Sequence, residues 1–310
     1  MEYGRILKQA GITIWKHKVI IWFGFLMIIP SLLMGFVVGG FFFFFNEDNI
    51  SSFFNPYASA PDINPLFPVL IVIVFLGFTI FSYVMMALSF AGVIKGTFDL
   101  EKQEHNISFG ELWDSTLPYI GRVFGVFFLV FFAIFLFFGS FMLFGALVGV
   151  VTAGIGFMCL MPFFLLMLPL ELVAYLFASL AMPAVVVENL GVFDALRRAW
   201  DVVKQKFWSS VLMAIILLFI QWALSMIIML PIQAVQFFAM FSMDITNYTP
   251  DPGSFFRGFA ILMVIFIPLA SLVQGLGMTY ANAAWTLTFM HLTQKPVLPE
   301  TPVFIEPVNA

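Results

Sequence analysis

The residue best suited to proton transfer or ligand binding is a carboxylate inside an apolar stretch. Glu171 lies between the uncharged residues 123–170 and 172–187. An ionised carboxylate at the centre of a membrane costs about 3 kcal/mol or more, so it must pair with a neighbour or stay protonated. The uncharged polar residues expected at similar depth are Gln221, Gln274, Asn282, Tyr83 and Tyr175. We predict an intramembrane polar site made of Glu171, Gln221, Gln274 and Asn282.

Two interpretations of Glu171 remain open. In the functional one, the carboxyl group is a protonatable or cation-binding site on a transport path. In the structural one, a neutral Glu171 forms hydrogen bonds across helices and holds them together.

Basic residues form a second group of candidates, on segments 3–18, 109–122 and 193–206. In the third segment Phe193, Leu196, Trp200 and Val203 recur at helical spacing and form one apolar stripe. Such a helix is expected to lie on the inner membrane surface, with its basic side chains toward anionic headgroups. It either binds lipid or a partner specifically, or merely anchors the next span. The candidate contact residues are Lys16, Lys18, Arg197, Arg198, Lys204 and Lys206.

Few other residues could support catalysis or metal binding. Cys159 is the single cysteine and lies in an apolar run, which excludes a disulfide framework and a thiolate metal site. The three histidines, His17, His105 and His291, are widely separated. We therefore predict no catalytic residue, no metal and no cofactor, and expect a non-enzymatic protein.

The composition decides which class of protein must position these residues. The chain has 310 residues, of which 62% are hydrophobic and 10% charged. A soluble domain has about 45–50% apolar and about 25% charged residues. A net charge of −4 without a basic domain argues against a nucleic-acid partner. The sequence is typical of a polytopic membrane protein.

Uncharged stretches predict six transmembrane helices. A helix needs about 20 residues to cross the hydrocarbon, so the stretch 123–170 is too long for one crossing. We expect it to form a tight hairpin with the residues that follow. The predicted spans cover residues 19–45, 63–94, near 123–145, near 156–183, 207–243 and 258–290.

The distribution of Lys and Arg predicts the orientation. With the amino terminus inside, every lysine and arginine except Arg257 falls on the inner side. The positive-inside rule then places both termini in the cytoplasm, and we expect the protein in the cell's inner (cytoplasmic) membrane. Several tryptophans, Trp15, Trp208 and Trp285 among them, fall near the inner boundary, as an aromatic belt would.

The chain also repeats itself loosely. Three units, at about 1–95, 108–187 and 191–290, each combine an interfacial amphipathic helix with a helical hairpin. The predicted fold is therefore all-α, with six transmembrane helices in three loosely repeated units and a single membrane domain at 1–294. Four prolines in residues 295–310 predict an extended cytoplasmic tail.

A family resemblance rests on the stretch Met182-Pro183-Ala-Val-Val-Val-Glu188-Asn-Leu-Gly191-Val-Phe-Asp-Ala-Leu-Arg-Arg-Ala-Trp200. It resembles the Pro…Val-x-Glu…Gly…Ala-Leu-x-x-(Ser/Ala)-Trp pattern of the six-helix membrane domain in some glycerophosphodiester phosphodiesterases. Related standalone membrane proteins of unknown function share it. In the phosphodiesterases, catalysis belongs to a separate barrel with His, Glu, Asp and a metal. This chain has no room for that barrel, so the resemblance does not imply the enzymatic activity.

The expected function is that of a structural or accessory subunit of a larger membrane complex, or of a lipid-interacting scaffold. The expected partners are membrane lipids, through anionic headgroups at the cytoplasmic face, and other membrane proteins. Phe-rich spans fit lipid contact or burial against such a protein. The alternative function is a small transporter or channel that uses Glu171.

Overall fold

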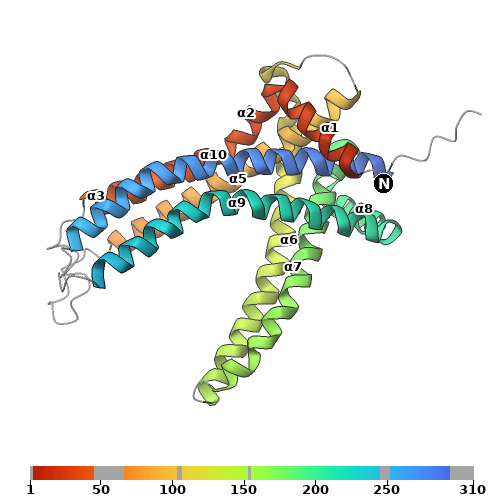
Figure 1. Cartoon of the computed structure of the whole chain (residues 1–310). Coiled ribbons are helices and arrows are strands. Elements are labelled where there is room, and N and C mark those ends of the chain that lie inside the picture. The colour runs from red at the N-terminus through yellow and green to blue at the C-terminus, as the bar shows by residue number, and fades with distance from the viewer. Residues whose placement is uncertain (1–2, 45–65, 103–106, 153–154, 245–251, 294–310) are drawn as a thin grey trace, which may run out of the picture.

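In the computed structural model every element in the described ranges is a helix (Figure 1). The structure describes residues 3–44, 66–102, 107–152, 155–244 and 252–293; the predicted tail 295–310 lies outside them. The helices are α1 (Tyr3–Lys16), α2 (Lys18–Leu26), α3 (Ile28–Phe44), α5 (Leu66–Lys102), α6 (Phe109–Val151), α7 (Ile155–Val187), α8 (Val192–Gln205), α9 (Phe207–Asp244) and α10 (Pro252–Thr293).

These helices have the length and composition of membrane spans. Within the described ranges, five are long and apolar enough to cross a membrane, and the bent pair α2–α3 makes six when it is counted as one span. The all-helical fold is therefore confirmed for the described ranges, with five to six helices that could span a membrane. Helix formation is expected here, because lipid offers the backbone no alternative hydrogen-bond partner.

The first predicted span is broken rather than straight. α2 and α3 meet at an angle of 45° next to Met27. Pro30 stands three residues beyond this break and has no backbone N–H to give to the carbonyl of Leu26. The missing hydrogen bond and the ring's steric demand explain why one helix becomes two.

The prediction of a separate interfacial helix at 109–122 was wrong. These residues form the beginning of α6, which continues without interruption to Val151. The helix starts where predicted, because the Ser108 hydroxyl accepts a 3.3 Å hydrogen bond from the backbone N–H of Glu111. Pro118 lies inside α6 and removes one backbone donor without ending the helix. The threefold repeat stays a prediction.

The long helices diverge from a common base (Figure 1). α6 and α7 run side by side and extend away from the group formed by α3, α5, α9 and α10. We call residues 131–151 of α6 and 155–170 of α7 the arm. α1, α2 and α8 lie near the end from which the two groups diverge.

Buried side chains gather at this common base. They come from α1, α2, the end of α5, the start of α6, the end of α7, α8, the start of α9 and the end of α10. Glycines allow the closest approaches. A Cβ on Gly24 would lie 1.7 Å from the Thr279 hydroxyl oxygen, and one on Gly92 would lie 2.0 Å from the Phe23 ring. The base is tightly packed, whereas residues 131–151 of α6 are mostly exposed.

The amphipathic helices α1 and α8 are confirmed as separate elements. α8 packs against the protein mainly through residues beside the predicted stripe, of which Val203 alone is buried. Its buried residues are Ala195, Ala199, Val202 and Val203. Phe193 and Trp200 are instead 76% and 45% exposed. Small alanines pack closely against the protein. Phe193 is thereby left to face lipid, whereas the Trp200 ring stacks on Phe177 at 5.3 Å and stays half-exposed.

Candidate functional site

A cavity of about 370 Å³ lies where the arm joins the remaining helices. α5, α6, α7, α9 and α10 all contribute to its wall, which is mostly Phe, Met, Ile, Val and Ala. Its volume falls within the usual range of small-molecule sites, about 300–1,000 Å³, and its lining is apolar with a few polar groups, as in such sites.

The structure brings three of the four predicted polar residues to this cavity. Glu171 from α7, Gln221 from α9 and Asn282 from α10 all line it. Gln274 does not; it lines two neighbouring cavities, of about 520 and 50 Å³. Three of the predicted residues thus surround one cavity. Gln274 lies about 12 Å from Asn282 along the axis of α10.

These groups lie deep within their helices. Glu171 is in the middle of α7 (Ile155–Val187), about 24 Å along the axis from either end. Asn282 lies about 16 Å before the end of α10 at Thr293. The cavity therefore opens far from the helix termini.

The polar groups of the cavity are poorly satisfied by the protein. The Gln221 side-chain N–H donates to the sulfur of Met278 at 3.3 Å, a weak acceptor. In the part of the chain that the structure describes, no hydrogen bond or ion pair involves the side chains of Glu171 and Asn282. An unsatisfied polar group at membrane depth costs several kcal/mol, on the order of 2–7.

Two aromatic side chains in the lining of the cavity contact each other. The indole N–H of Trp285 donates to the Tyr175 hydroxyl at 3.1 Å, and the rings meet edge to face at 6.1 Å. Trp285 is only 2% exposed, so its assignment to an interfacial belt was wrong. Helical spacing could have indicated this, because Trp285 and Asn282 are three residues apart and share a face of α10.

The predicted basic contacts lie at the base, and most are exposed. Lys16, Lys18, Arg197, Lys204 and Lys206 all have exposed side chains. They alternate with exposed tryptophans: Trp15 is 81% and Trp208 80% exposed. The ammonium group of Lys204 lies 4.8 Å from the Trp200 ring centre. This arrangement suits an interface with lipid headgroups.

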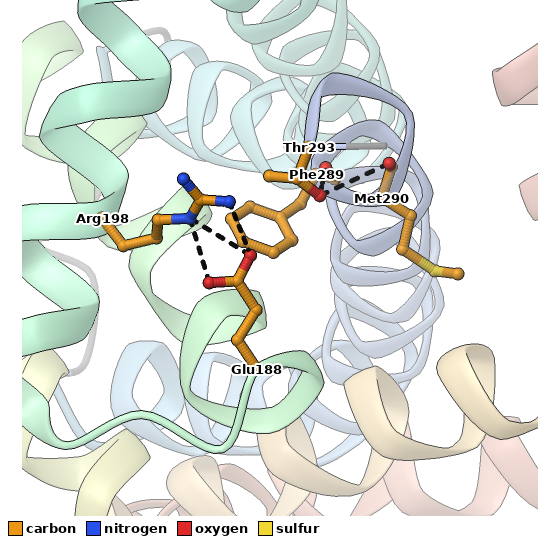
Figure 2. A network of polar contacts seen from close by, with 5 residues as sticks. All are labelled: Glu188, Arg198, Phe289, Met290 and Thr293. Carbon is orange, nitrogen blue, oxygen red and sulfur yellow. Dashed lines mark hydrogen bonds and ion pairs between the residues drawn. The ribbon is translucent and has the colours of Figure 1, made fainter. Parts of the chain in front are cut away.

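Arg198 differs from the other basic residues, because it is held by an ion pair (Figure 2). Its guanidinium donates from Nε and Nη2 to both carboxylate oxygens of Glu188, at 2.9–3.1 Å. The pair joins α8 to the residue that follows α7. Figure 2 also shows the Thr293 hydroxyl, which donates to the Phe289 carbonyl at 2.8 Å and closes the last turn of α10.

A second arginine fastens the same corner. Arg122 of α6 donates to the Asn189 side-chain oxygen at 2.8 Å and to its backbone carbonyl at 3.3 Å. Asn189 has φ = 52°, a left-handed conformation that asparagine tolerates better than most residues. Gly125 lets α6 approach Val192 closely. The stretch that carries the family resemblance thus forms the α7–α8 corner.

This corner makes a prediction with a built-in control. Replacing Arg198 with Ala should destabilise the protein by about 1 kcal/mol, since the side chains of the bidentate pair are 36% and 28% exposed and solvent screens the charges. Arg197→Ala, one position away, should change stability by less than about 0.5 kcal/mol, because surface substitutions rarely do more. Unfolding by titration with sodium dodecyl sulfate in mixed micelles measures both. Equal effects of the two substitutions would contradict the structural role of the pair.

Metal ligands are not gathered in the described part of the chain. There, no group of three or more His, Cys, Asp or Glu side chains is placed to hold an ion. The cavity has one carboxylate, with amide and phenol groups beside it.

Comparison with known proteins gives one result. The model of a domain of unknown function (DUF7847) matches residues 116–288, which include all three polar residues of the cavity and the α7–α8 corner. No curated protein and no solved structure matches the chain. The resemblance to the phosphodiesterase-associated membrane domain stays a prediction. Because the match covers more than half of the sequence, the chain belongs to the family of the domain of unknown function DUF7847.

Proposed function

We propose that this chain is a non-enzymatic structural subunit of a larger membrane assembly. In this proposal its base rests on lipid at the cytoplasmic face of the inner membrane, and its arm packs against a partner membrane protein. The observation that carries the proposal is the exposure of the α6 part of the arm, residues 131–151, on several faces at once.

Three consecutive residues of α6 show this exposure. Phe135 is 60%, Leu136 51% and Phe137 51% exposed. Because neighbouring helix positions point about 100° apart, these side chains cover more than half of the helix circumference. A helix inside a bundle has its packed face buried. The arm therefore offers aromatic surface on sides that the chain itself does not cover, and burial of aromatic rings dominates many interfaces.

The base supports the orientation in the proposal. Exposed tryptophan and lysine side chains, such as Trp15, Lys16 and Lys18, gather at the packed end. These residue types anchor proteins at the membrane–water interface, and the lysines attract anionic lipid. In this proposal the end with most of the Lys and Arg residues is the cytoplasmic one, as the positive-inside rule predicts.

The cavity supports the non-enzymatic part of the proposal. Its lining contains one carboxylate and neither histidine nor lysine. General acid–base catalysis uses a positioned donor and a positioned acceptor of suitable pKa. Besides Glu171 the lining offers the phenol of Tyr175, whose hydroxyl is already engaged by the Trp285 indole N–H.

A photoreactive phenylalanine analogue at position 135 tests the arm. We expect it to cross-link one protein partner in the native membrane. The matched control is position 219 on α9, where Phe219 is 64% exposed and no partner is proposed. It should cross-link lipid. Lipid adducts alone at both positions would contradict the structural-subunit proposal.

A transporter or channel is the second candidate function, favoured by the polar residues that meet in the cavity at mid-helix. Proton- or cation-dependent flux in proteoliposomes should then fall when Glu171 is replaced by Gln. Under the structural proposal the same variant assembles normally and no such flux exists to be lost.

A further inference from the structure

We propose that the cavity binds a lipophilic amine, meaning an apolar molecule that carries one protonated nitrogen. The juxtaposition that points to this ligand is a carboxylate, two amides and aromatic rings around one apolar cavity: Glu171, Gln221, Asn282, Tyr175 and Trp285. This inference goes beyond the proposed structural role and does not depend on it, since Phe132 and Phe135, the arm residues on which that role is tested, do not line the cavity.

The polar side chains of the cavity lack strong hydrogen-bond partners. Glu171 and Asn282 make no side-chain hydrogen bond within the described part of the chain, and Gln221 has a thioether acceptor. Glu171 is exposed and Asn282 is half-buried, but lipid, unlike water, offers such a polar group no hydrogen-bond partner. A ligand with hydrogen-bond donors would satisfy the carboxylate and both amide carbonyls.

The cavity contains a single acidic side chain and no basic one. The carboxylate of Glu171 faces a cavity whose lining includes no Lys, Arg or His. An ionised Glu171 therefore finds no counter-charge within the lining. A protonated amine supplies that charge together with N–H donors, and a charge-assisted hydrogen bond to a carboxylate is about twice as strong as a neutral one.

The size and the lining of the cavity suit an organic cation better than a bare inorganic one. A bare inorganic cation requires several oxygen ligands close around it, at about 2.0–2.6 Å. A cavity of about 370 Å³ lined mainly by apolar side chains has room for an organic body as well. Phe90, Phe127 and Phe131 belong to that lining, and aromatic faces attract cations. The cavity thus matches both parts of an amphiphilic amine.

A ligand can reach the cavity from the surrounding membrane. Glu171 has an exposed side chain, and Phe131 beside the cavity is 46% exposed. Both lie where the arm leaves the other helices. A molecule dissolved in the membrane can therefore reach the carboxylate without opening the packed base.

Photolabelling of the full-length protein in phosphatidylcholine nanodiscs tests the proposal. The probes are dodecylamine and dodecanol, each with a diazirine on the alkyl chain, and labelled peptides are identified by mass spectrometry. We expect the amine to label the cavity peptides about tenfold more than the alcohol, which corresponds to 1.4 kcal/mol. Glu171→Gln should reduce amine labelling to the level of the alcohol. Gln274→Leu, outside the cavity, should leave both unchanged.

A cavity-filling variant keeps the test decisive if the Gln variant misfolds. Ala174 lines the cavity, and Ala174→Phe should lower the labelling by both probes. Equal labelling of the cavity by amine and alcohol in the wild-type protein would overturn the proposal, as would amine labelling that survives Glu171→Gln. Neither result affects cross-linking from position 135, so the two proposals fail separately.

Discussion

Gly92→Ala should destabilise the protein by about 2–3 kcal/mol, because the added methyl group overpacks the core of the base. The new Cβ would lie 2.0 Å from the Phe23 ring, which is completely buried. The movement of that ring is restricted, since the Phe109 and Trp113 rings lie 4.9 and 6.1 Å from it. The free energy of unfolding in mixed micelles measures the loss.

Gly77→Ala is the matched control for this substitution. Gly77 is in the same helix, α5, and a Cβ there would meet nothing within 4 Å. Alanine is the better helix former by about 1 kcal/mol, so this variant should be as stable as the wild type or slightly more stable. Combining Gly92→Ala with Phe23→Leu should cost less than the sum of the two. Additive effects would show that the close contact is absent.

Trp285→Ala should cost about 3 kcal/mol or more, the second large effect we expect. Trp285 is among the largest fully buried side chains, and it packs in the base while its N–H bonds to Tyr175. Its removal leaves a void beside the existing cavity, which the surrounding helices fill only in part.

Trp285→Phe separates packing from hydrogen bonding. Phenylalanine retains most of the ring but cannot donate to the Tyr175 hydroxyl, so the loss should be about 1–2 kcal/mol. Tyr175→Phe removes the same hydrogen bond from the other side and should cost a similar amount. If Trp285→Ala were no worse than Trp285→Phe, the indole would not fill the core as described.

The amino-acid sequence predicts the helices well, because long apolar stretches have few structural solutions in lipid. The break at Met27 was also readable, since Pro30 stands inside the first predicted span. The continuous start of α6 was not. An amphipathic pattern at 109–122 fits an interfacial helix or the packed end of a span, and tertiary packing of Leu112 and Thr116 decides between them.

The candidate site was predictable in its members but not in its arrangement. Glu171, Gln221 and Asn282 stand out as polar residues in apolar helices, and all three line the cavity. Gln274 has the same chemical character and faces elsewhere. Helix packing determines which faces of α7, α9 and α10 contact one another, and local sequence patterns do not predict it. The same holds for Arg198, whose ion pair with Glu188 depends on the turn at Asn189.

The composition of the native particle tests the central claim most directly. The tagged protein is extracted in mild detergent, and native mass spectrometry gives the mass and the identity of every component. The account predicts a fixed ratio of this chain to at least one other membrane protein, and predicts that the partner is lost when Phe132 and Phe135 of the arm are replaced by Ala. A monomer or homo-oligomer that carries lipid and no other protein would contradict it.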